Sequence, residues 1–328
     1  MKNKYTIYYW ASDTRSNTGE GVLANMFLSD IKKYYKNYIL VNINKNIDNY
    51  HSFYNKYFLN FFGAIQLWKY YCNGHKTLYI NYLPIWNFLT FLVLPPKTIL
   101  GPITGSLLYN KYSLLDTLRR KFLLNIFKNI SLFIIFLRNK KILFSTELLK
   151  SSIKEHKLLK RCYFNYTLKA FPGFSQKKNK RDIDFLIYHR LHKNKNNEMI
   201  EYFIKNTLDK KYKIIVVGDP INLKNILNIG YISRVKIKTL LSNTKYTFGS
   251  SENLYTLFLL DAISKNVFIF YDSNLKIFNT QIKYDKMLDI NFNDKFKSLK
   301  LIVNNVNKPK KLNSKNYLQK TNYENYFK

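Results

Sequence analysis

Acidic residues are scarce in this chain of 328 residues, which contains 20 Asp and Glu against 54 Lys and Arg. The resulting formal net charge of +34 indicates an anionic partner, such as nucleic acid, acidic lipid or a phosphorylated substrate. The coding bias of an AT-rich genome explains the charge equally well, because Lys, Asn, Ile, Tyr and Phe are all abundant. The few carboxylates therefore carry more information about function than the many basic residues.

Cysteine is also scarce, and only Cys72 and Cys162 are present. Without a Cys-x-x-Cys pair or companion histidines, neither a disulfide framework nor a zinc site is indicated. Met1 leads into a predicted strand at residues 5–10, and the segment lacks the apolar core and cleavage site of a signal peptide. The longest apolar stretch, residues 122–137, is interrupted by polar residues and is too short to span a bilayer comfortably. We therefore expect a cytoplasmic protein.

Apolar residues are plentiful, at 46% hydrophobic and 17% aromatic, and this excludes wholesale disorder. The chain opens with the predicted strand at 5–10, a loop at 11–21, an amphipathic helix at about 22–35 and a second strand. This order is typical of the start of a doubly wound α/β domain. In the loop, Gly19 and Gly21 would let backbone amides approach a phosphate or a sugar, although a tight turn explains them equally well.

The pattern breaks between Leu168 and Arg181, where Pro-Gly is followed by a basic run, and we interpret this segment as an interdomain linker. Strands and helices then alternate again. The sequence thus predicts two doubly wound, Rossmann-like α/β domains facing a cleft, at residues 1–172 and 173–310. A basic tail with a terminal helix is expected at residues 311–328.

Two segments place polar residues directly after predicted strands, at the edge where α/β sheets bind ligands. Arg190 and Lys195 follow the strand at residues 183–188, and there they would neutralise a diphosphate, Arg as a forked donor and Lys as a point charge. Their spacing alone means little in so basic a chain; their position after the strand singles them out. Gly218 and Asp219 end the next strand.

The stretch at residues 250–262 combines two serines, a carboxylate and an apolar helix after a short strand. Ser250 or Ser251 would cap the helix, with Glu252 near its positive end. Asp261 lies further along the helix, within Leu-Asp-Ala. Because acidic residues are few, these two carboxylates are the strongest candidates for a functional site.

With these motifs in order, the chain resembles the GT-B glycosyltransferases, and especially those of family 4. In that family a strand ends in Gly-Arg-Leu, followed by three residues and Lys-Gly. Here Arg190-Leu191 and Lys195-Asn196 fit the pattern, while His189, the histidine expected to face the cleft, replaces the first glycine. The family's later motif is Glu, seven residues and Glu within Leu-Glu-Ala. Here it becomes Glu252, eight residues and Asp261, and the extra residue affects the role of Glu252 most.

The resemblance covers residues 183–271 in motif order, and the first domain in architecture and the Gly19–Gly21 loop. It implies a nucleotide-sugar-dependent, hexosyltransferase-like enzyme whose first domain receives the acceptor and whose second domain binds the donor. The implied catalytic and donor-binding residues are Arg190 and Lys195 at the diphosphate, Glu252 with Asn253 and Leu254 near the donor sugar, Asp261 at the ribose hydroxyls, and Gly218 and Asp219 near the nucleobase.

The chemistry of such a site needs no metal or other cofactor. Two cations and helix-terminal amides stabilise the charge that develops on a leaving diphosphate. Asp182 and Asp184 form an Asp-x-Asp sequence at the start of a strand, and we interpret them as its solvated edge. We expect metal-independent transfer, retaining if the resemblance holds; Asp13 and Glu20 are the carboxylates to test if transfer inverts. The expected acceptor is a glycan or a lipid-linked molecule, in cell-envelope polysaccharide or lipopolysaccharide synthesis.

The stretch at residues 119–138 mixes basic and large apolar side chains. It suits an interfacial helix on anionic lipid, which would make the protein peripheral on the inner face of the cytoplasmic membrane. A core helix with a basic solvent face is the slightly favoured alternative.

Two other function classes stay open. A non-catalytic binder of nucleic acid or anionic membrane is suggested by charge and interleaved aromatics. However, no nucleic-acid-binding motif is present and the basic residues are spread along the chain, so no specific nucleic-acid partner is expected. A nucleotide-sugar epimerase with the GT-B fold is the second alternative, and it would act without an acceptor.

Overall fold

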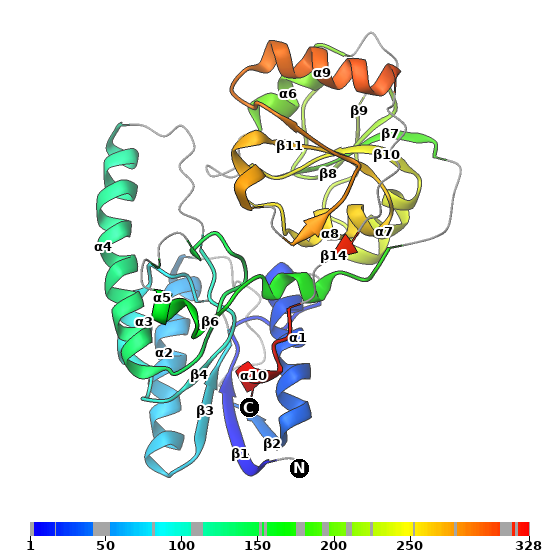
Figure 1. Ribbon diagram of the computed structural model, residues 1–328. Coiled ribbons are helices and arrows are strands. Elements are labelled where there is room, and N and C mark those ends of the chain that lie inside the picture. The colour runs from blue at the N-terminus through cyan, green and yellow to red at the C-terminus, as the bar shows by residue number, and fades with distance from the viewer. Residues whose placement is uncertain are drawn as a thin grey trace. The chain divides into compact units, whose positions relative to one another are not determined.

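A computed structural model of the protein describes residues 3–16, 18–41, 53–80, 83–105, 114–150, 153, 156–174, 181–191, 197–207, 212–223, 226–251, 253–278, 281–308, 317–318 and 321–327 (Figure 1). The chain divides into two compact units: residues 1–167 with 321–328, and residues 168–320. The division falls at the start of the segment expected to link two domains.

A four-stranded parallel sheet forms the centre of the first unit, in the order β2-β1-β3-β4. Its strands are β1 (Asn3–Trp10), β2 (Tyr35–Leu40), β3 (Lys76–Tyr79) and β4 (Ile99–Leu100). The helices are α1 (Gly19–Tyr34), α2 (Phe53–Cys72), α3 (Phe88–Val93), α4 (Leu114–Arg138) and α5 (His156–Leu159). Two short parallel strands, β5 (Ile142–Leu143) and β6 (Cys162–Tyr163), precede a 3-10 helix, η2 (Tyr166–Ala170).

Both faces of this sheet are covered by helices. Side chains alternate along each strand, so each strand contributes apolar residues to both faces. In β1, Ile7 packs into the apolar cluster of α1, and Trp10 packs into the cluster that includes residues of α2, α3 and α4. Leu78 and Tyr79 of β3 divide between the two clusters in the same way. Helices on both faces are the arrangement expected of a doubly wound domain.

The segment at residues 321–327 completes the cluster on the α1 side. Tyr326 and Phe327 of α10 (Glu324–Phe327) contact Phe27 of α1, with ring centroids 6.2 and 5.4 Å apart. The Tyr326 hydroxyl also donates a hydrogen bond to the carbonyl of Leu100. The terminal helix predicted within residues 311–328 is shorter than expected, because the short strand β14 (Tyr317–Leu318) precedes a single helical turn.

The second unit contains a six-stranded parallel sheet in the order β13-β11-β10-β7-β8-β9. Its strands are β7 (Ile183–His189), β8 (Ile214–Gly218), β9 (Ile226–Asn228), β10 (Thr244–Phe248), β11 (Phe268–Asp272) and β13 (Met287–Ile290). Its helices are α6 (Glu198–Lys205), α7 (Arg234–Ser242), α8 (Leu257–Ser264), α9 (Lys295–Asn307) and the 3-10 helix η4 (Ser273–Phe278). Strand β12 (Ile282–Lys283) pairs antiparallel with β14. Two successive parallel α/β units confirm the predicted fold class.

Two helix predictions were wrong. The apolar pattern of residues 146–156 predicts a helix, but residues 146–149 form bends and turns, and α5 begins at His156. The helix expected after Ser250 or Ser251 begins only at Leu257, and Thr256 caps it by accepting a hydrogen bond from the backbone N–H of Leu259. The delay arises because the Asn253 side chain accepts from the N–H of Tyr255, a local turn that competes with the helix.

Candidate nucleotide-sugar site

The topology of the second sheet identifies one edge as the candidate ligand site. The chain runs from β7 outward to β8 and β9, and then places β10 on the other side of β7. At such a reversal the loops diverge, and open α/β sheets bind ligands outside the carboxyl ends of these strands. Strand β7 ends at His189 and β10 ends at Phe248, so the loops starting at Arg190 and Gly249 border this point.

The ends of β7 and β8 are joined through a position that requires glycine. Gly218 has φ +99°, and a Cβ there would lie 2.2 Å from the carbonyl oxygen of His189. The tight approach lets the N–H of Asp219 donate to the same carbonyl at 3.0 Å. The role of Gly218 visible in the structure is therefore to bring Asp219 to the end of β7.

Asp219 is the best-defined carboxylate at this edge. Its side chain accepts from the Tyr231 hydroxyl at 2.7 Å and from the N–H of Leu191 at 2.6 Å. These two hydrogen bonds, with that of Tyr231 first, lower the pKa of Asp219. Asp219 therefore holds the backbone after Arg190, whose side chain is exposed at the sheet edge. The Arg190 carbonyl accepts from the Asn197 side chain at 2.8 Å, which secures the loop from its other end.

His189 does not face the ligand edge as expected. Its ring is 1% exposed, and its Nδ1 lies 2.9 Å from the carbonyl oxygen of Asp219. As the last residue of β7 it points to the buried side, because side chains alternate along a strand. Lys195 and Glu252 lie outside the described residues, so their predicted roles stay predictions.

The turn between β10 and α8 contains the other predicted donor residues. Asn253 shapes the turn through its bond to Tyr255, whereas Leu254 is buried at 3% exposure and contributes to the core. Thr256 caps α8, whereas the cap predicted from the sequence was Ser250 or Ser251. The cap of α8 thus lies five or six residues further toward the C-terminus than predicted.

Asp261 lies on α8 as predicted, but its carboxylate is bound within the protein. It is 1% exposed and receives two hydrogen bonds from Arg234, at 2.6 Å from Nε and 2.8 Å from a terminal nitrogen. Lys238 lies 3.7 Å away. Both cations are on α7, so the pair fastens α7 to α8. A contact of Asp261 with ribose hydroxyls would have to share these oxygens with Arg234.

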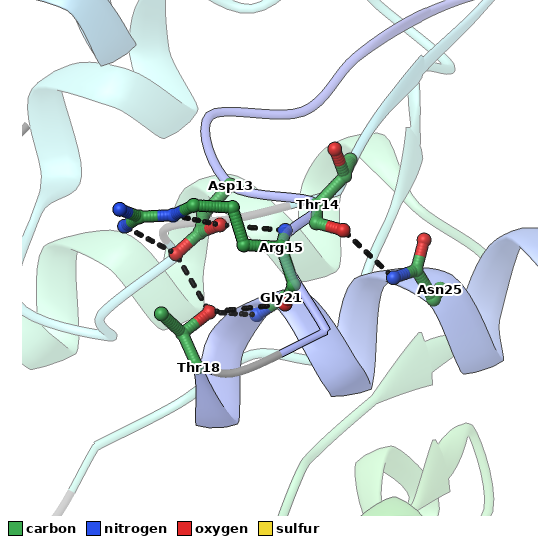
Figure 2. Close-up of polar contacts among 6 residues, drawn as sticks. All are labelled: Asp13, Thr14, Arg15, Thr18, Gly21 and Asn25. Carbon is green, nitrogen blue, oxygen red and sulfur yellow. Dashed lines mark hydrogen bonds and ion pairs between the residues drawn. The ribbon is translucent and has the colours of Figure 1, made fainter. Parts of the chain in front are cut away.

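The loop after β1 forms a second polar cluster, in the first unit (Figure 2). Strand β1 lies between β2 and β3, so this loop also follows a reversal of strand order. Asp13 accepts from the backbone and guanidinium of Arg15 at 2.9–3.1 Å and from Thr18 at 2.8 Å. Burial acts to raise the pKa of Asp13, but the hydrogen bonds from Arg15 and Thr18 outweigh it and the pKa is lowered. A carboxylate held ionised in this way is a poor general base at neutral pH.

The two glycines of this loop differ in their surroundings. Gly21 donates its N–H to Thr18, the cap of α1, and a Cβ there would lie 2.0 Å from the carbonyl oxygen of Arg15. Gly21 thus lets the loop cross the helix start, which matches the tight-turn interpretation. Gly19 is the first residue of α1 and is exposed.

No protein-family model matches the sequence, and no curated protein matches it. Solved structures that are similar along nearly the whole chain include the following two. The UDP-GlcNAc 2-epimerase of Methanocaldococcus jannaschii, in complex with UDP-GlcNAc and UDP, is 11% identical, with a TM-score of 0.51 over 97% of this chain and 96% of that one. A glycosyltransferase from Rickettsia africae ESF-5 is also 11% identical, with a TM-score of 0.51 over 93% of this chain and 88% of that one. The chain has the GT-B fold. At this identity the likeness concerns the fold alone.

The Asp-x-Asp sequence lies at the amino end of β7, away from the carboxyl edge of the GT-B sheet. Asp182 pairs with Lys213 at 3.1 Å, and Asp184 pairs with Lys245 at 2.8 Å. These contacts agree with a strand-edge role. In the described part of the chain, no three His, Cys, Asp or Glu side chains gather as metal ligands would.

Two residues that contribute to the site were missed in the sequence. Tyr231 follows Gly230, a residue at φ +68°, and a Gly-Tyr pair after a short strand is a weak signal for a turn at a sheet edge. Arg234 follows the capping residue Ser233, which gives the helix start but not the partner. Its pairing with Asp261, 27 positions away, depends on how α7 packs against α8 and leaves no sequence pattern.

Proposed function

We propose that this protein is a glycosyltransferase that moves a sugar from a nucleotide-diphosphate donor to an acceptor hydroxyl. The observation that supports this proposal is that Arg190, Asp219 and the start of α8 follow the carboxyl ends of neighbouring strands, where the strand order of a GT-B sheet reverses. This edge offers an exposed cation, an ionised carboxylate and a helix start within one set of neighbouring loops. The bound UDP-GlcNAc of the similar archaeal epimerase supports a nucleotide-sugar ligand.

In this proposal Arg190 and Lys195 hold the diphosphate, and the turn with Asn253 and Leu254 offers backbone amides to the donor. Asp219 orients the loop that carries Arg190 and borders the nucleobase. Glu252 lies near the donor sugar, as in the family 4 enzymes that the motifs resemble. We assign Asp261 a positioning role through Arg234, and contact with ribose requires the two to share hydrogen bonds.

The reaction breaks the bond between the anomeric carbon and the diphosphate oxygen and forms a bond from that carbon to the acceptor oxygen. Negative charge develops on the departing diphosphate oxygen, and this oxygen takes up the proton that the acceptor hydroxyl loses. Cations and helix-terminal amides stabilise that charge without a metal. We propose retention of configuration, as in the family 4 enzymes that the motifs resemble. The acceptor is a glycan or a lipid-linked molecule of the cell envelope.

Thermal-shift screening against UDP-, GDP-, ADP- and CMP-sugars tests the donor site. We expect one nucleotide class to stabilise the wild type, and the shift to disappear in the Arg190→Ala/Lys195→Ala variant. Lys213→Ala/Lys245→Ala removes the same number of cations at the opposite edge of the sheet and should keep the shift. No shift with any nucleotide sugar would refute the proposal.

Product analysis with the stabilising donor separates transfer from its alternative. Isomerisation of the donor sugar without an acceptor would identify an epimerase instead. Loss of transfer in EDTA that added Mg²⁺ restores would refute the metal-independent mechanism.

A further inference from the structure

Helix α4 presents an apolar stripe on its exposed face. The stripe consists of Phe122, Leu123, Ile126, Ile130, Phe133 and Leu137, which are between 38% and 74% exposed. Their spacing places them on one side of the helix. The opposite side, with Leu132 and Ile135, packs into the core of the first unit.

This arrangement is unusual for a surface helix. A helix that is apolar on all sides is normally buried, and soluble monomers rarely expose large continuous apolar patches. At 1.5 Å per residue, the stripe extends about 22 Å along the helix. Lys128 is buried at 9% exposure, so this lysine does not contribute to a basic solvent face.

The patch continues onto the neighbouring helix α3. The rings of Phe88 and Phe127 lie 5.1 Å apart, and Arg138 at the end of α4 donates to the carbonyls of Phe91 and Leu92. Leu89 and Leu92 of α3 are about half exposed. Figure 1 shows α4 standing at one edge of the first unit, with α3 beside its lower half. The apolar surface therefore extends over two neighbouring helices of this unit.

Basic residues flank the stripe at both ends. Arg119, Arg120 and Lys121 precede it in the sequence, and the exposed Lys140 and Lys141 follow it. No acidic residue occurs between Asp116 and Glu147. An occupant of this face must therefore be apolar at its centre and anionic at its margins.

We propose that α4 docks this protein on an anionic lipid bilayer, with the stripe inserted at the level of the headgroups. A helix lying in the interface buries its apolar face by about 5–10 Å, and flanking Lys and Arg bind acidic headgroups. Here the opposite face of α4 packs into the core of the first unit, so the helix is already formed before it meets the membrane. The assignment does not depend on the sugar chemistry proposed above.

Two other occupants fit this face less well. A second copy of the chain related by a two-fold axis would bring the same basic ends together, in a protein with a net charge of +34. Single-stranded nucleic acid binds aromatic side chains by base stacking, but four of the six stripe residues are Leu or Ile. Charge and composition together favour acidic lipid.

Vesicle flotation of the full chain tests this docking. A protein this basic binds acidic vesicles through charge alone, so the decisive condition is about 0.5 M salt, where exposed charges are screened within a few ångströms. At about 0.1 M salt we expect stronger binding to vesicles containing about one-third phosphatidylglycerol than to pure phosphatidylcholine. At about 0.5 M salt the wild type should still stay on the phosphatidylglycerol vesicles through the apolar stripe. Phe122→Ser/Phe133→Ser should lower the partition coefficient about tenfold for each phenylalanine withdrawn.

Phe296→Ser is the matched control, because Phe296 is 73% exposed on α9 of the second unit, against 70% for Phe133. It should bind vesicles as the wild type does. Equal binding by the stripe variant and the wild type would overturn the proposal, as would an equal loss in Phe296→Ser. A dimer in solution that only the stripe variant dissociates would overturn it in favour of a second copy.

Discussion

Replacing Arg234 by alanine leaves the buried carboxylate of Asp261 without its main partner. Asp261 is 1% exposed and would lose the bonds of 2.6 and 2.8 Å, keeping only Lys238 at 3.7 Å. Removing one partner of a buried ion pair costs about 3–5 kcal/mol. The Arg234 side chain is 22% exposed and Lys238 remains, so we place the loss at the lower limit, about 3 kcal/mol.

A double-mutant cycle isolates the interaction. Asp261→Asn keeps one acceptor oxygen but turns an amide toward the guanidinium, and should cost about 2 kcal/mol. In Arg234→Ala/Asp261→Asn the uncompensated charge is gone, so the double variant should be more stable than the sum of the single losses predicts, with a coupling of about 2 kcal/mol. Lys238→Ala should cost at most about 0.5 kcal/mol, because that contact is long and partly exposed.

Urea unfolding gives the free energies, and hydrogen exchange of peptides from α7 and α8 localises the loss. For a unit of this size, about 3 kcal/mol corresponds to a fall in Tm of roughly 6–12 °C. Additive single and double effects, or a loss below about 1 kcal/mol in Arg234→Ala, would refute the assignment of this pair as the fastening between α7 and α8.

Three further predictions follow from the same contacts. Gly218→Ala should lower the free energy of unfolding in urea by about 3 kcal/mol, because the Cβ would lie 2.2 Å from the His189 carbonyl oxygen. Gly230→Ala should cost about 1 kcal/mol, because Gly230 also has a positive φ but a Cβ there would meet no atom within 4 Å. Equal costs of the two variants would contradict this reasoning. Asp13 has a lowered pKa in the folded state, so its stabilising effect is present above the unfolded pKa of about 4 and is lost as pH falls through the lower folded value. The destabilisation by Asp13→Asn in urea at pH 7 should therefore shrink toward pH 3, and a constant difference would count against it. Tyr326→Ala should lower the free energy of unfolding by about 3 kcal/mol, since the ring is buried against Phe27. Hydrogen exchange should increase in α1 but not in α7. Unchanged exchange in α1 would show that the contact does not stabilise the first unit.

The fold class was predictable because strands and helices alternate with clear apolar periods in both halves of the chain. The order β7, β8, β10 and the positions of Arg190, Gly218 and Asp219 after their strands followed from that pattern. The start of α8 did not, because two polar side chains compete for it: Asn253 forms a local turn, and Thr256 provides the cap. In the sequence, Ser250 is as good a candidate for the helix cap as Thr256, the residue that caps α8.

Side-chain direction was the other source of error. Alternation along β7 turns His189 into the core, although its position after a strand suggested a ligand contact. Asp261 was predicted to bind a ligand because carboxylates are few, and its contact with Arg234 depends on packing between α7 and α8. The scarcity of carboxylates drew attention to Asp261, but its binding partner depends on tertiary contacts that the sequence does not show.

The return of residues 321–327 to the first unit has a consequence for synthesis. The ribosome makes the whole second unit before it makes Tyr323, Tyr326 and Phe327, yet these rings belong to the core around α1. Domains commonly fold in the order in which they emerge. Here the core around α1 stays incomplete until the second unit has been synthesised. The first unit is therefore translated first but completes its folding last.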